Sequence, residues 1–157
     1  MKKIALFLCA VVITIGLASC SQQVADVPTS EIMSQVRSQI ELPEMGDIKK
    51  EAIAAYMDLK PEDMTEMSYI ISGSGITADE LFVAKAADKA GAEKIKAAAE
   101  KRKTKQHKEF ESYNPDEVPK LEKAYIGIKG NYVIFAVTND SSKVSSLFDK
   151  ALTKNAK

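Results

Sequence analysis

A two-residue break between two apolar segments constrains the fold of this chain more than any other feature. Gly130 and Asn131 separate residues 124–129 from residues 132–138, and a two-residue loop of this kind is typical of a tight β-hairpin turn. The turn sets the register, and the predicted pairs are Ile128 with Val133, Ile126 with Phe135 and Ala124 with Val137. These six apolar side chains then share one sheet face, which belongs to the core. A primed turn also requires a positive φ angle at Gly130.

Two further segments are predicted to be strands. Residues 67–72 are rich in Tyr and Ile, and residues 80–86 contain the apolar run Leu81, Phe82 and Val83; both compositions favour strands. The Ser- and Gly-rich connection between them is flexible enough for an antiparallel return.

Apolar residues at helical spacing predict helices over residues 30–40, 48–59, 88–113 and 141–154, and residues 115–123 allow a further short helix. Thr29 or Ser30 is expected to cap the first helix. In the longest helix one face is apolar and the opposite side is rich in lysine, and the apolar positions are Ile95, Ala98, Ala99, Phe110 and Tyr113. Pro115 ends this helix because proline disfavours helical geometry in the residue before it.

The order of these elements predicts an α+β fold. We expect a mainly antiparallel sheet of about four strands, covered by amphipathic helices that include one long central helix. Residues 29–157 are expected to form a single domain, because about 130 residues can bury a core without disulfides or metals.

The N-terminus indicates export. Lys2 and Lys3 precede an apolar run over residues 4–16, which is too short for a comfortable membrane span of about 20 residues and is typical of a signal peptide. The run ends in Leu-Ala-Ser-Cys at residues 17–20, which matches the lipobox of bacterial lipoproteins. The small residues fit a peptidase, and the thiol of Cys20 is the nucleophile that accepts a lipid.

This motif divides the chain into a signal peptide at residues 1–19, a lipidated N-terminus and tether at residues 20–28, and the domain. We expect the protein to be lipid-anchored through Cys20 at the extracytoplasmic face of the bacterial cell membrane. Cys9 is removed with the signal, so the domain retains no thiol. Loss of Lys2 and Lys3 takes the 22 basic residues to 20 against 22 acidic ones, and this balance does not favour nucleic acid as a partner.

Three motifs then suggest a family. They are Ser-Gly-Ser-Gly-Ile-Thr-Ala-Asp-Glu at residues 72–80, Glu-Lys-Arg at 100–102 with Phe-Glu-Ser-Tyr-Asn-Pro at 110–115, and Lys-Gly-Asn-Tyr-Val at 129–133. With these motifs the chain resembles the small bacterial lipoproteins grouped as domain of unknown function 4358, from about Glu31 to Lys150. The resemblance implies an envelope location and a shared fold. The family has no established activity, so the resemblance implies no catalytic residues.

Besides the lipidation residue Cys20, the candidate site residues are Arg102 and Gln106. Helical spacing places both near the centre of the apolar stripe of the long helix. Arg102 is either a structural residue, whose stem covers the sheet while its guanidinium pairs with a carboxylate or a carbonyl, or the floor of a pocket for an anion. We favour the structural interpretation, under which Arg102→Leu should alter the fold mildly at most.

The other polar groups have simpler structural explanations. His107, the only histidine, falls on the flank of the long helix among lysines, and no set of three or four ligands for zinc is apparent. The Ser-Gly repeat at residues 72–75 lacks the spacing of a nucleophile elbow or a phosphate loop. The pairs Glu62-Asp63, Asp79-Glu80 and Asp116-Glu117 fall at predicted turns or helix starts, where carboxylates accept hydrogen bonds from free backbone N–H groups. The basic run at residues 101–108 could touch anionic lipids, but neighbouring glutamates dilute its charge.

We therefore expect no catalytic residues, no metal and no cofactor. The leading hypothesis is a non-enzymatic lipoprotein that binds an envelope protein or a cell-wall polymer. The alternatives are a lipoprotein that binds a small ligand and, less favoured, a cell-wall hydrolase. A concave pocket with convergent polar groups would favour the small ligand, and a flat exposed apolar patch would favour a macromolecular partner.

Overall fold

A five-stranded antiparallel sheet forms the centre of the structure, a computed structural model that describes residues 24–153. The strands are β1 (Met45–Asp47), β2 (Glu66–Ser72), β3 (Glu80–Lys85), β4 (Tyr125–Lys129) and β5 (Tyr132–Val137). Their order across the sheet is β1-β2-β3-β5-β4, and each neighbouring pair is antiparallel. The predicted α+β class and antiparallel sheet are confirmed, with one strand more than expected.

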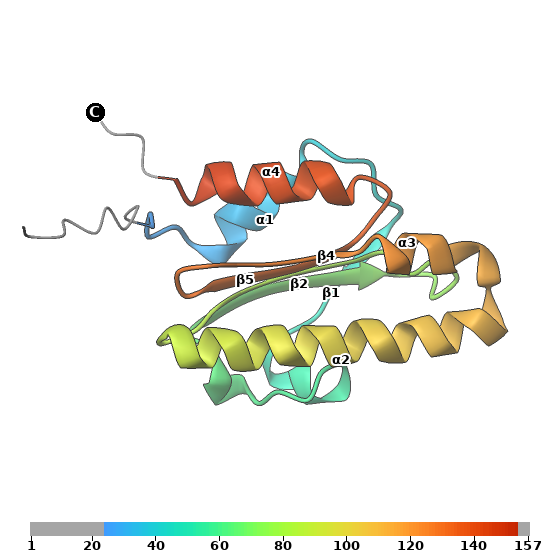
Figure 1. Ribbon diagram of the computed structural model, residues 1–157, viewed down its shortest axis with the longest axis horizontal. Coiled ribbons are helices and arrows are strands. Elements are labelled where there is room, and N and C mark those ends of the chain that lie inside the picture. The colour runs from blue at the N-terminus through green and yellow to red at the C-terminus, as the bar shows by residue number, and fades with distance from the viewer. Residues whose placement is uncertain (1–23, 154–157) are drawn as a thin grey trace, which may run out of the picture.

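Helices cover both faces of this sheet (Figure 1). The α-helices are α1 (Thr29–Arg37), α2 (Lys89–Tyr113), α3 (Val118–Glu122) and α4 (Ser141–Ala151), and the short 3-10 helices are η1 (Lys50–Ala55), η2 (Pro61–Asp63) and η3 (Pro115–Glu117). α1 and α4 lie on one face, and the long helix α2 lies along the other with η1 and η2 beside it. α2 is the long central helix that the sequence predicts.

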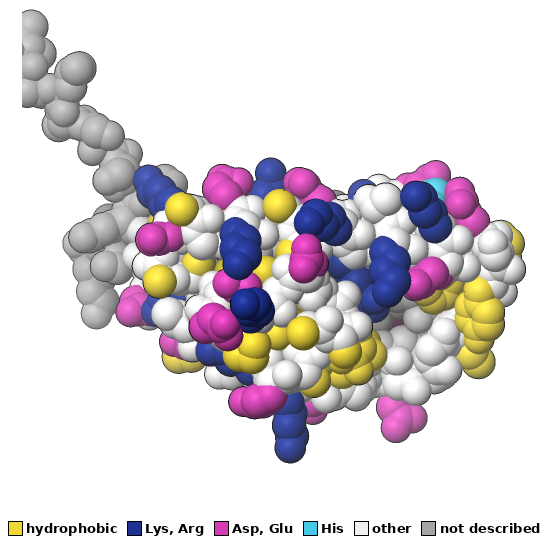
Figure 2. Space-filling model, turned by 90° about the horizontal axis from the view of Figure 1, so that it is seen from below, with side chains coloured by type: hydrophobic (Ala, Val, Ile, Leu, Met, Phe, Trp, Pro, Cys, Tyr) yellow, Lys and Arg dark blue, Asp and Glu magenta, His cyan; other side chains and the backbone are white. Residues whose placement is uncertain are grey.

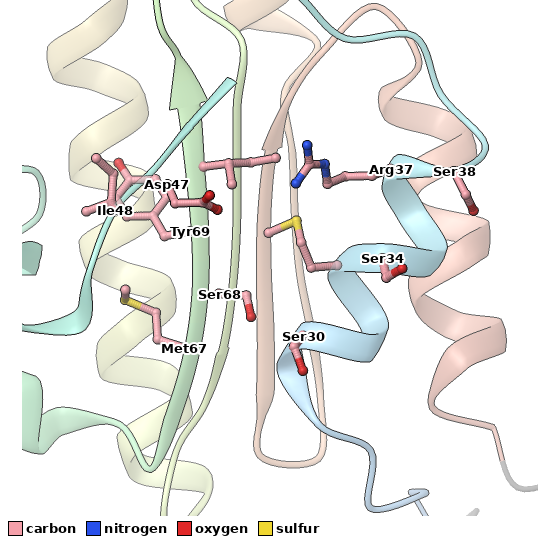
Figure 3. A pocket seen from close by; sticks show the side chains of 11 residues that line it. Ser30, Ser34, Arg37, Ser38, Asp47, Ile48, Met67, Ser68 and Tyr69 are labelled. Atoms are coloured by element: carbon pink, nitrogen blue, oxygen red, sulfur yellow. The ribbon is translucent and has the colours of Figure 1, made fainter. Parts of the chain in front are cut away.

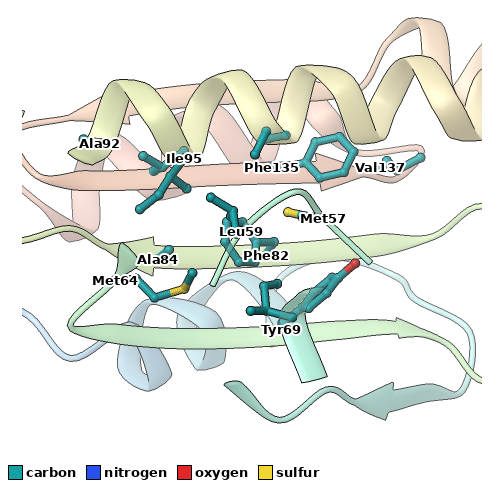
Figure 4. Packing of buried hydrophobic residues seen from close by; sticks show 14 of the residues in the cluster. Met57, Leu59, Met64, Tyr69, Phe82, Ala84, Ala92, Ile95, Phe135 and Val137 are labelled. Atoms are coloured by element: carbon teal, nitrogen blue, oxygen red, sulfur yellow. The ribbon is translucent and has the colours of Figure 1, made fainter. Parts of the chain in front are cut away.

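Successive side chains of the central strand β3 point alternately into two apolar layers, one on each face of the sheet. Phe82 and Ala84 of β3 face the core under α2, while Leu81 and Val83 face the core under α1 and α4. Both sets are buried, because a strand sends successive side chains to opposite faces and helices cover both of these faces. Figure 4 shows part of the first layer, in which Ile95 of α2 packs towards the sheet.

The predicted hairpin is confirmed, although β4 begins at Tyr125 and its register with β5 does not include the predicted pair of Ala124 with Val137. Ile128 pairs with Val133 and Ile126 pairs with Phe135. Gly130 has a φ angle of 60°, which is the left-handed geometry that the turn requires. β2 and β3 also pair antiparallel, as expected.

The predicted helix over residues 48–59 is wrong at both ends, because residues 48–49 and 56–59 are not helical. Residues 45–47, which lie between the first two predicted helices, form the edge strand β1, and the Ile48 N–H donates to the Tyr69 carbonyl at 2.8 Å. The helical portion is the 3-10 helix η1. Edge pairing with β2 satisfies the backbone groups that a longer helix would otherwise pair within itself.

Two details of the helices also differ from expectation. Pro28 holds the N-cap position of α1 without a side-chain cap, and the Thr29 N–H donates instead to Glu66 Oε2 at 3.1 Å. Tyr113 is 65% exposed, although its spacing predicted a buried position. The last turn of α2 extends past the end of the sheet, so no strand lies beneath this residue (Figure 1).

Part of the predicted tether lies against the domain. Val24 forms an isolated antiparallel bridge with Thr153, and the Ala25 N–H donates to the Leu152 carbonyl at 3.0 Å. Residues 24–28 are therefore in contact with the fold. The predicted signal peptide, Cys20 and the remainder of the tether lie outside the described residues.

Candidate functional site

A buried ion pair joins β3 to α2. Glu80, the first residue of β3, has a side chain that is 1% exposed, and Arg102 near the middle of α2 has a side chain that is 13% exposed. Arg102 Nε donates to Glu80 Oε1 at 3.3 Å and to Oε2 at 3.2 Å, while Nη2 donates to Oε2 at 3.1 Å. The planar guanidinium suits this arrangement, in which two nitrogens engage one carboxylate.

Tyrosines complete the surroundings of this pair. The Tyr69 hydroxyl of β2 donates to Glu80 Oε1 at 2.5 Å, and the ring of Tyr56 lies 5.9 Å from the Arg102 guanidinium carbon, in cation–π range. Burial, and after it the charge of Glu80, raise the pKa of the Tyr69 phenol far above its usual value. Burial by itself would lower the pKa of Arg102, but the charge and the hydrogen bonds of Glu80, with contributions from Tyr69 and Glu109, together outweigh burial and the pKa rises. The phenol therefore keeps its proton and the guanidinium keeps its charge.

This geometry bears on the two interpretations of Arg102. A pocket floor requires a guanidinium that is free to meet a ligand, whereas here the guanidinium engages Glu80. The pairing is the one that the structural interpretation requires. Gln106, one turn further along α2, is 5% exposed, and among residues 24–153 its Oε1 is a buried side-chain atom without a hydrogen-bond partner.

A second cluster of charged side chains includes Asp79, the residue directly before Glu80. Lys120 of α3 donates to Asp79 Oδ2 at 2.8 Å and to Glu117 Oε2 at 2.7 Å, and all three side chains are at most 14% exposed. Glu117 Oε2 also accepts the Ala78 N–H at 2.8 Å. Burial would lower the pKa of Lys120, but its hydrogen bonds to Asp79 and Glu117 raise it.

The two clusters hold the β2–β3 connection against the helices that follow it in the sequence. The Asn114 side chain adds a third link, because its amide donates to the Ile76 carbonyl at 3.1 Å. The interpretation of Asp79-Glu80 as a pair of turn carboxylates is wrong for Glu80, which lies in a strand and accepts hydrogen bonds from two side chains. One signal could have found it: a buried acid is a favourable partner for an inward arginine, and Glu80 begins a run of apolar strand residues.

A groove between α1 and the β2 side of the sheet is the first surface candidate. It has a volume of about 590 Å³, and its lining includes Ser30, Ser34 and Arg37 of α1, with Asp47 and Ser68 across from them. Figure 3 shows the Arg37 and Asp47 side chains pointing towards each other from opposite walls. The groove therefore presents hydroxyls and both signs of charge.

A second groove runs between α2 and the edge strand β4. It has a volume of about 610 Å³, and its lining includes Lys103, His107 and Ile126. His107 is 30% exposed and lies 3.4 Å from Glu111 and 3.8 Å from Glu122. It is thus half-buried beside two carboxylates and is not surrounded by lysines alone. Within the described residues, no group of three or more His, Cys, Asp or Glu side chains could hold a metal ion.

Lysines in the basic run of α2 form ion pairs with separate acidic side chains. Lys101 lies 3.0 Å from Asp58, and Lys105 lies 3.8 Å from Glu109. Figure 2 shows basic and acidic side chains interspersed over the α2 side of the molecule. The surface is therefore mixed in charge.

Residues 38–138 match the family described as domain of unknown function DUF4358. The chain belongs to the DUF4358 family. The family assignment drawn from the three motifs is thereby confirmed, and both buried charge clusters of this DUF4358 chain lie within the matched segment. Neither a curated protein nor a solved structure matches the chain. No helix within residues 24–153 combines the length and the apolar character that crossing a membrane requires.

Proposed function

We propose that this chain is a lipid-anchored lipoprotein of the bacterial cell envelope, attached through Cys20, whose domain binds an envelope protein or a cell-wall polymer without catalysing a reaction. The observation that carries the proposal is the Leu-Ala-Ser-Cys sequence at residues 17–20, placed directly after a basic start and a short apolar run. Position, charge, hydrophobicity and spacing agree with export and lipidation.

The buried charges support a binding role over a catalytic one. An acid–base catalyst requires an ionisable group with access to substrate and a pKa suited to proton transfer. Glu80 is engaged by Arg102 and Tyr69, while Asp79 and Glu117 are engaged by Lys120. The buried ionisable groups therefore stabilise the packing of α2 and α3 on the sheet.

The groove between α1 and β2 supports binding. Ser30, Ser34 and Arg37 make no side-chain hydrogen bond or ion pair with another described residue, so they are available to a partner. A small ligand is the second candidate because a volume of about 590 Å³ lies within the range of small-molecule sites. A protein or polymer would extend beyond the groove, and a small ligand would be confined to it.

Lipidation is tested by metabolic labelling with a fatty-acid analogue in the bacterial host. Cys20→Ala should abolish labelling and leave the precursor uncleaved. Cys9→Ala is the matched control, because it changes the other cysteine of the chain and should label like the wild type. Label retained at the wild-type level in Cys20→Ala would contradict the proposal.

The occupant of the groove is tested by photocrosslinking in cells. A photoreactive amino acid at Ser34 should capture a specific macromolecule, whereas one at the exposed Ser142 of α4, outside the groove, should not. Capture of the same product from both positions would contradict binding in the groove. A small molecule retained at Ser34, with no macromolecular adduct, would favour the second candidate.

A further inference from the structure

Residues 24–28 are clamped to one end of the domain by several independent contacts. Val24 and Ala25 pair with the backbone of residues 152–153, directly after α4. Two residues later, the Val27 N–H donates to the hydroxyl oxygen of Tyr132 at 3.0 Å. The segment therefore continues the fold as far as its first described residue.

Tyr132 is the centre of this clamp. It is 3% exposed, and its hydroxyl lies 3.0 Å from Asp26 Oδ1 and 2.9 Å from the Val27 carbonyl, two acceptors for its single proton. Lys85 donates to the same Asp26 oxygen at 2.6 Å and lies 5.5 Å from the Tyr132 ring. One buried phenol thus holds the backbone and a side chain of the N-terminal segment.

The hairpin turn supplies the surface for Val24. A Cβ atom built on Gly130 would lie 3.0 Å from Val24 Cγ2, so the glycine that the turn requires also permits the close approach of the N-terminal segment. On the other side of the turn, the Asn131 side chain donates to the Ala87 carbonyl at 3.1 Å, just before α2. The clamp, the hairpin turn, the start of α2 and the end of α4 therefore meet at one end, here called the attachment end.

Chain length then limits how far this end can lie from a lipid on Cys20. Four residue steps separate Cys20 from Val24, and an extended chain spans at most about 14 Å over that number. If residues 24–28 were free, the nine steps to Thr29 would span about 32 Å. The clamp thus shortens the maximum reach of the tether by more than half.

We propose that the attachment end is a membrane-facing surface and that the clamp holds it against the lipid headgroups, with the opposite end of the domain directed away from the bilayer. The inference rests on the proposed lipidation of Cys20. The opposite end carries the β2–β3 connection and the end of α2, where Ile76 and Tyr113 are 56% and 65% exposed. α2 runs between the two ends (Figure 1), and its 25 residues span about 36 Å.

The tether enforces this orientation, and electrostatic attraction does not. Charges of both signs occupy the attachment end, where Lys85 pairs with Asp26 and Lys129 pairs with Asp149. The chain after the signal has 20 basic and 22 acidic residues once Lys2 and Lys3 are removed from the 22 of each sign. A domain with this balance is not drawn flat onto an anionic bilayer.

Energy transfer from a single tryptophan to dansyl headgroups tests the orientation, because the chain contains no Trp. Residues 20–157 contain every described element, and Cys20 is the sole cysteine among them, so a maleimide lipid in vesicles couples there specifically. Lys150→Trp places the donor at the exposed end of α4, and Tyr113→Trp places it at the far end of α2. We expect transfer from position 150 to exceed that from position 113 several-fold, at low and high salt alike. Equal transfer from the two positions would overturn the proposal.

Two further variants test the clamp in the Lys150→Trp background. A ten-residue Gly/Ser insertion after Gln23 leaves the domain unchanged and should lower transfer several-fold. Ala25→Pro with Tyr132→Phe removes one backbone donor and the bonding hydroxyl, and should lower transfer if circular dichroism shows an intact fold. Tyr125→Phe is the matched control and should change nothing.

Transfer that is unaffected by the insertion would overturn the proposal, even if the clamp variant fails to fold. Unchanged transfer in a folded clamp variant would overturn the role assigned to Tyr132. Because the lipid is coupled chemically, these results do not depend on lipidation in cells, so a failure here is distinct from a failure of the labelling experiment with Cys20→Ala.

Discussion

Replacing Arg102 with leucine should strand the carboxylate of Glu80 in the interior. The Glu80 side chain is 1% exposed and takes three contacts from the guanidinium, at 3.1 to 3.3 Å. Removing one partner of a buried pair costs about 3–5 kcal/mol, because the remaining charge is neither paired nor hydrated. Leucine retains part of the packing of the arginine stem, so the loss should come mainly from the charge. This expectation replaces the mild effect that follows from the sequence alone.

A double variant separates the stranded charge from lost packing. Arg102→Leu with Glu80→Gln removes both charges, and the glutamine carbonyl can still accept the Tyr69 hydroxyl. Its free energy of unfolding should lie within about 2 kcal/mol of the wild type, since exchanging both members of a buried pair costs far less than removing one. Lys101→Leu is the matched control. Its side chain is 71% exposed, and a surface pair contributes about 0–1 kcal/mol.

Urea unfolding followed by circular dichroism measures these differences. With an m-value of roughly 2 kcal/mol/M, a loss of 3–5 kcal/mol lowers the midpoint by about 1.5–2.5 M. The double-mutant cycle then gives the coupling between the two side chains. A midpoint for Arg102→Leu equal to that of the wild type, or a double variant no more stable than the single one, would refute the assignment of the pair as a structural link.

Three further outcomes follow from particular contacts. Gly130→Val should lower the free energy of unfolding in urea by more than about 1 kcal/mol, because the φ angle of 60° and the adjacent Val24 both disfavour a branched side chain. Gly130→Asn should lower the free energy of unfolding less, and equal losses in the two variants would contradict the prediction. Because the pKa of Lys120 is raised in the fold, the stability that its charge contributes is complete below pH 10.5 and is lost as the pH rises through the folded value. The difference in free energy of unfolding between the wild type and Lys120→Met should therefore shrink in alkali. A difference that stays constant with pH would contradict this prediction. Phe110 is 8% exposed and Tyr113 is 65% exposed, so Phe110→Ala should lower stability by about 3–5 kcal/mol, whereas Tyr113→Ala should change it by less than about 0.5 kcal/mol. A thermal melt in which Tyr113→Ala is the less stable variant would contradict this ranking.

The elements that were predictable from sequence are those whose signal is local. The hairpin follows from alternation around two turn residues, and α2 follows from 25 residues of helical spacing. The edge strand β1 was missed because three residues carry too short a pattern, and its pairing with β2 defines it. Tyr113 was misplaced because periodicity reports which way a side chain points and not whether the sheet continues beneath it.

Long-range pairing accounts for what was missing at the candidate site. Helical spacing correctly directed Arg102 inwards, but its partner Glu80 is 22 positions away in the sequence. The Lys120 cluster was missed for the same reason, because 41 positions separate Lys120 from Asp79. Neither separation has a periodicity that a single sequence reveals, whereas the preference of an inward cation for a buried acid partner is a usable signal.

The segment that matches DUF4358 leaves out two helices that cover one face of the sheet. Residues 38–138 include the whole sheet and the helix that covers one of its faces, but α1 ends at Arg37 and α4 begins at Ser141. Those two helices cover Leu81, Val83 and Ile134 on the other face, and an apolar face without its cover would be left in water. The folded unit therefore includes segments from both sides of the match. The chain before α1 and the chain after α4 meet where Val24 pairs with Thr153. The helices that cover this second face of the sheet therefore lie next to the contacts that hold residues 24–28, which follow the proposed lipid attachment at Cys20.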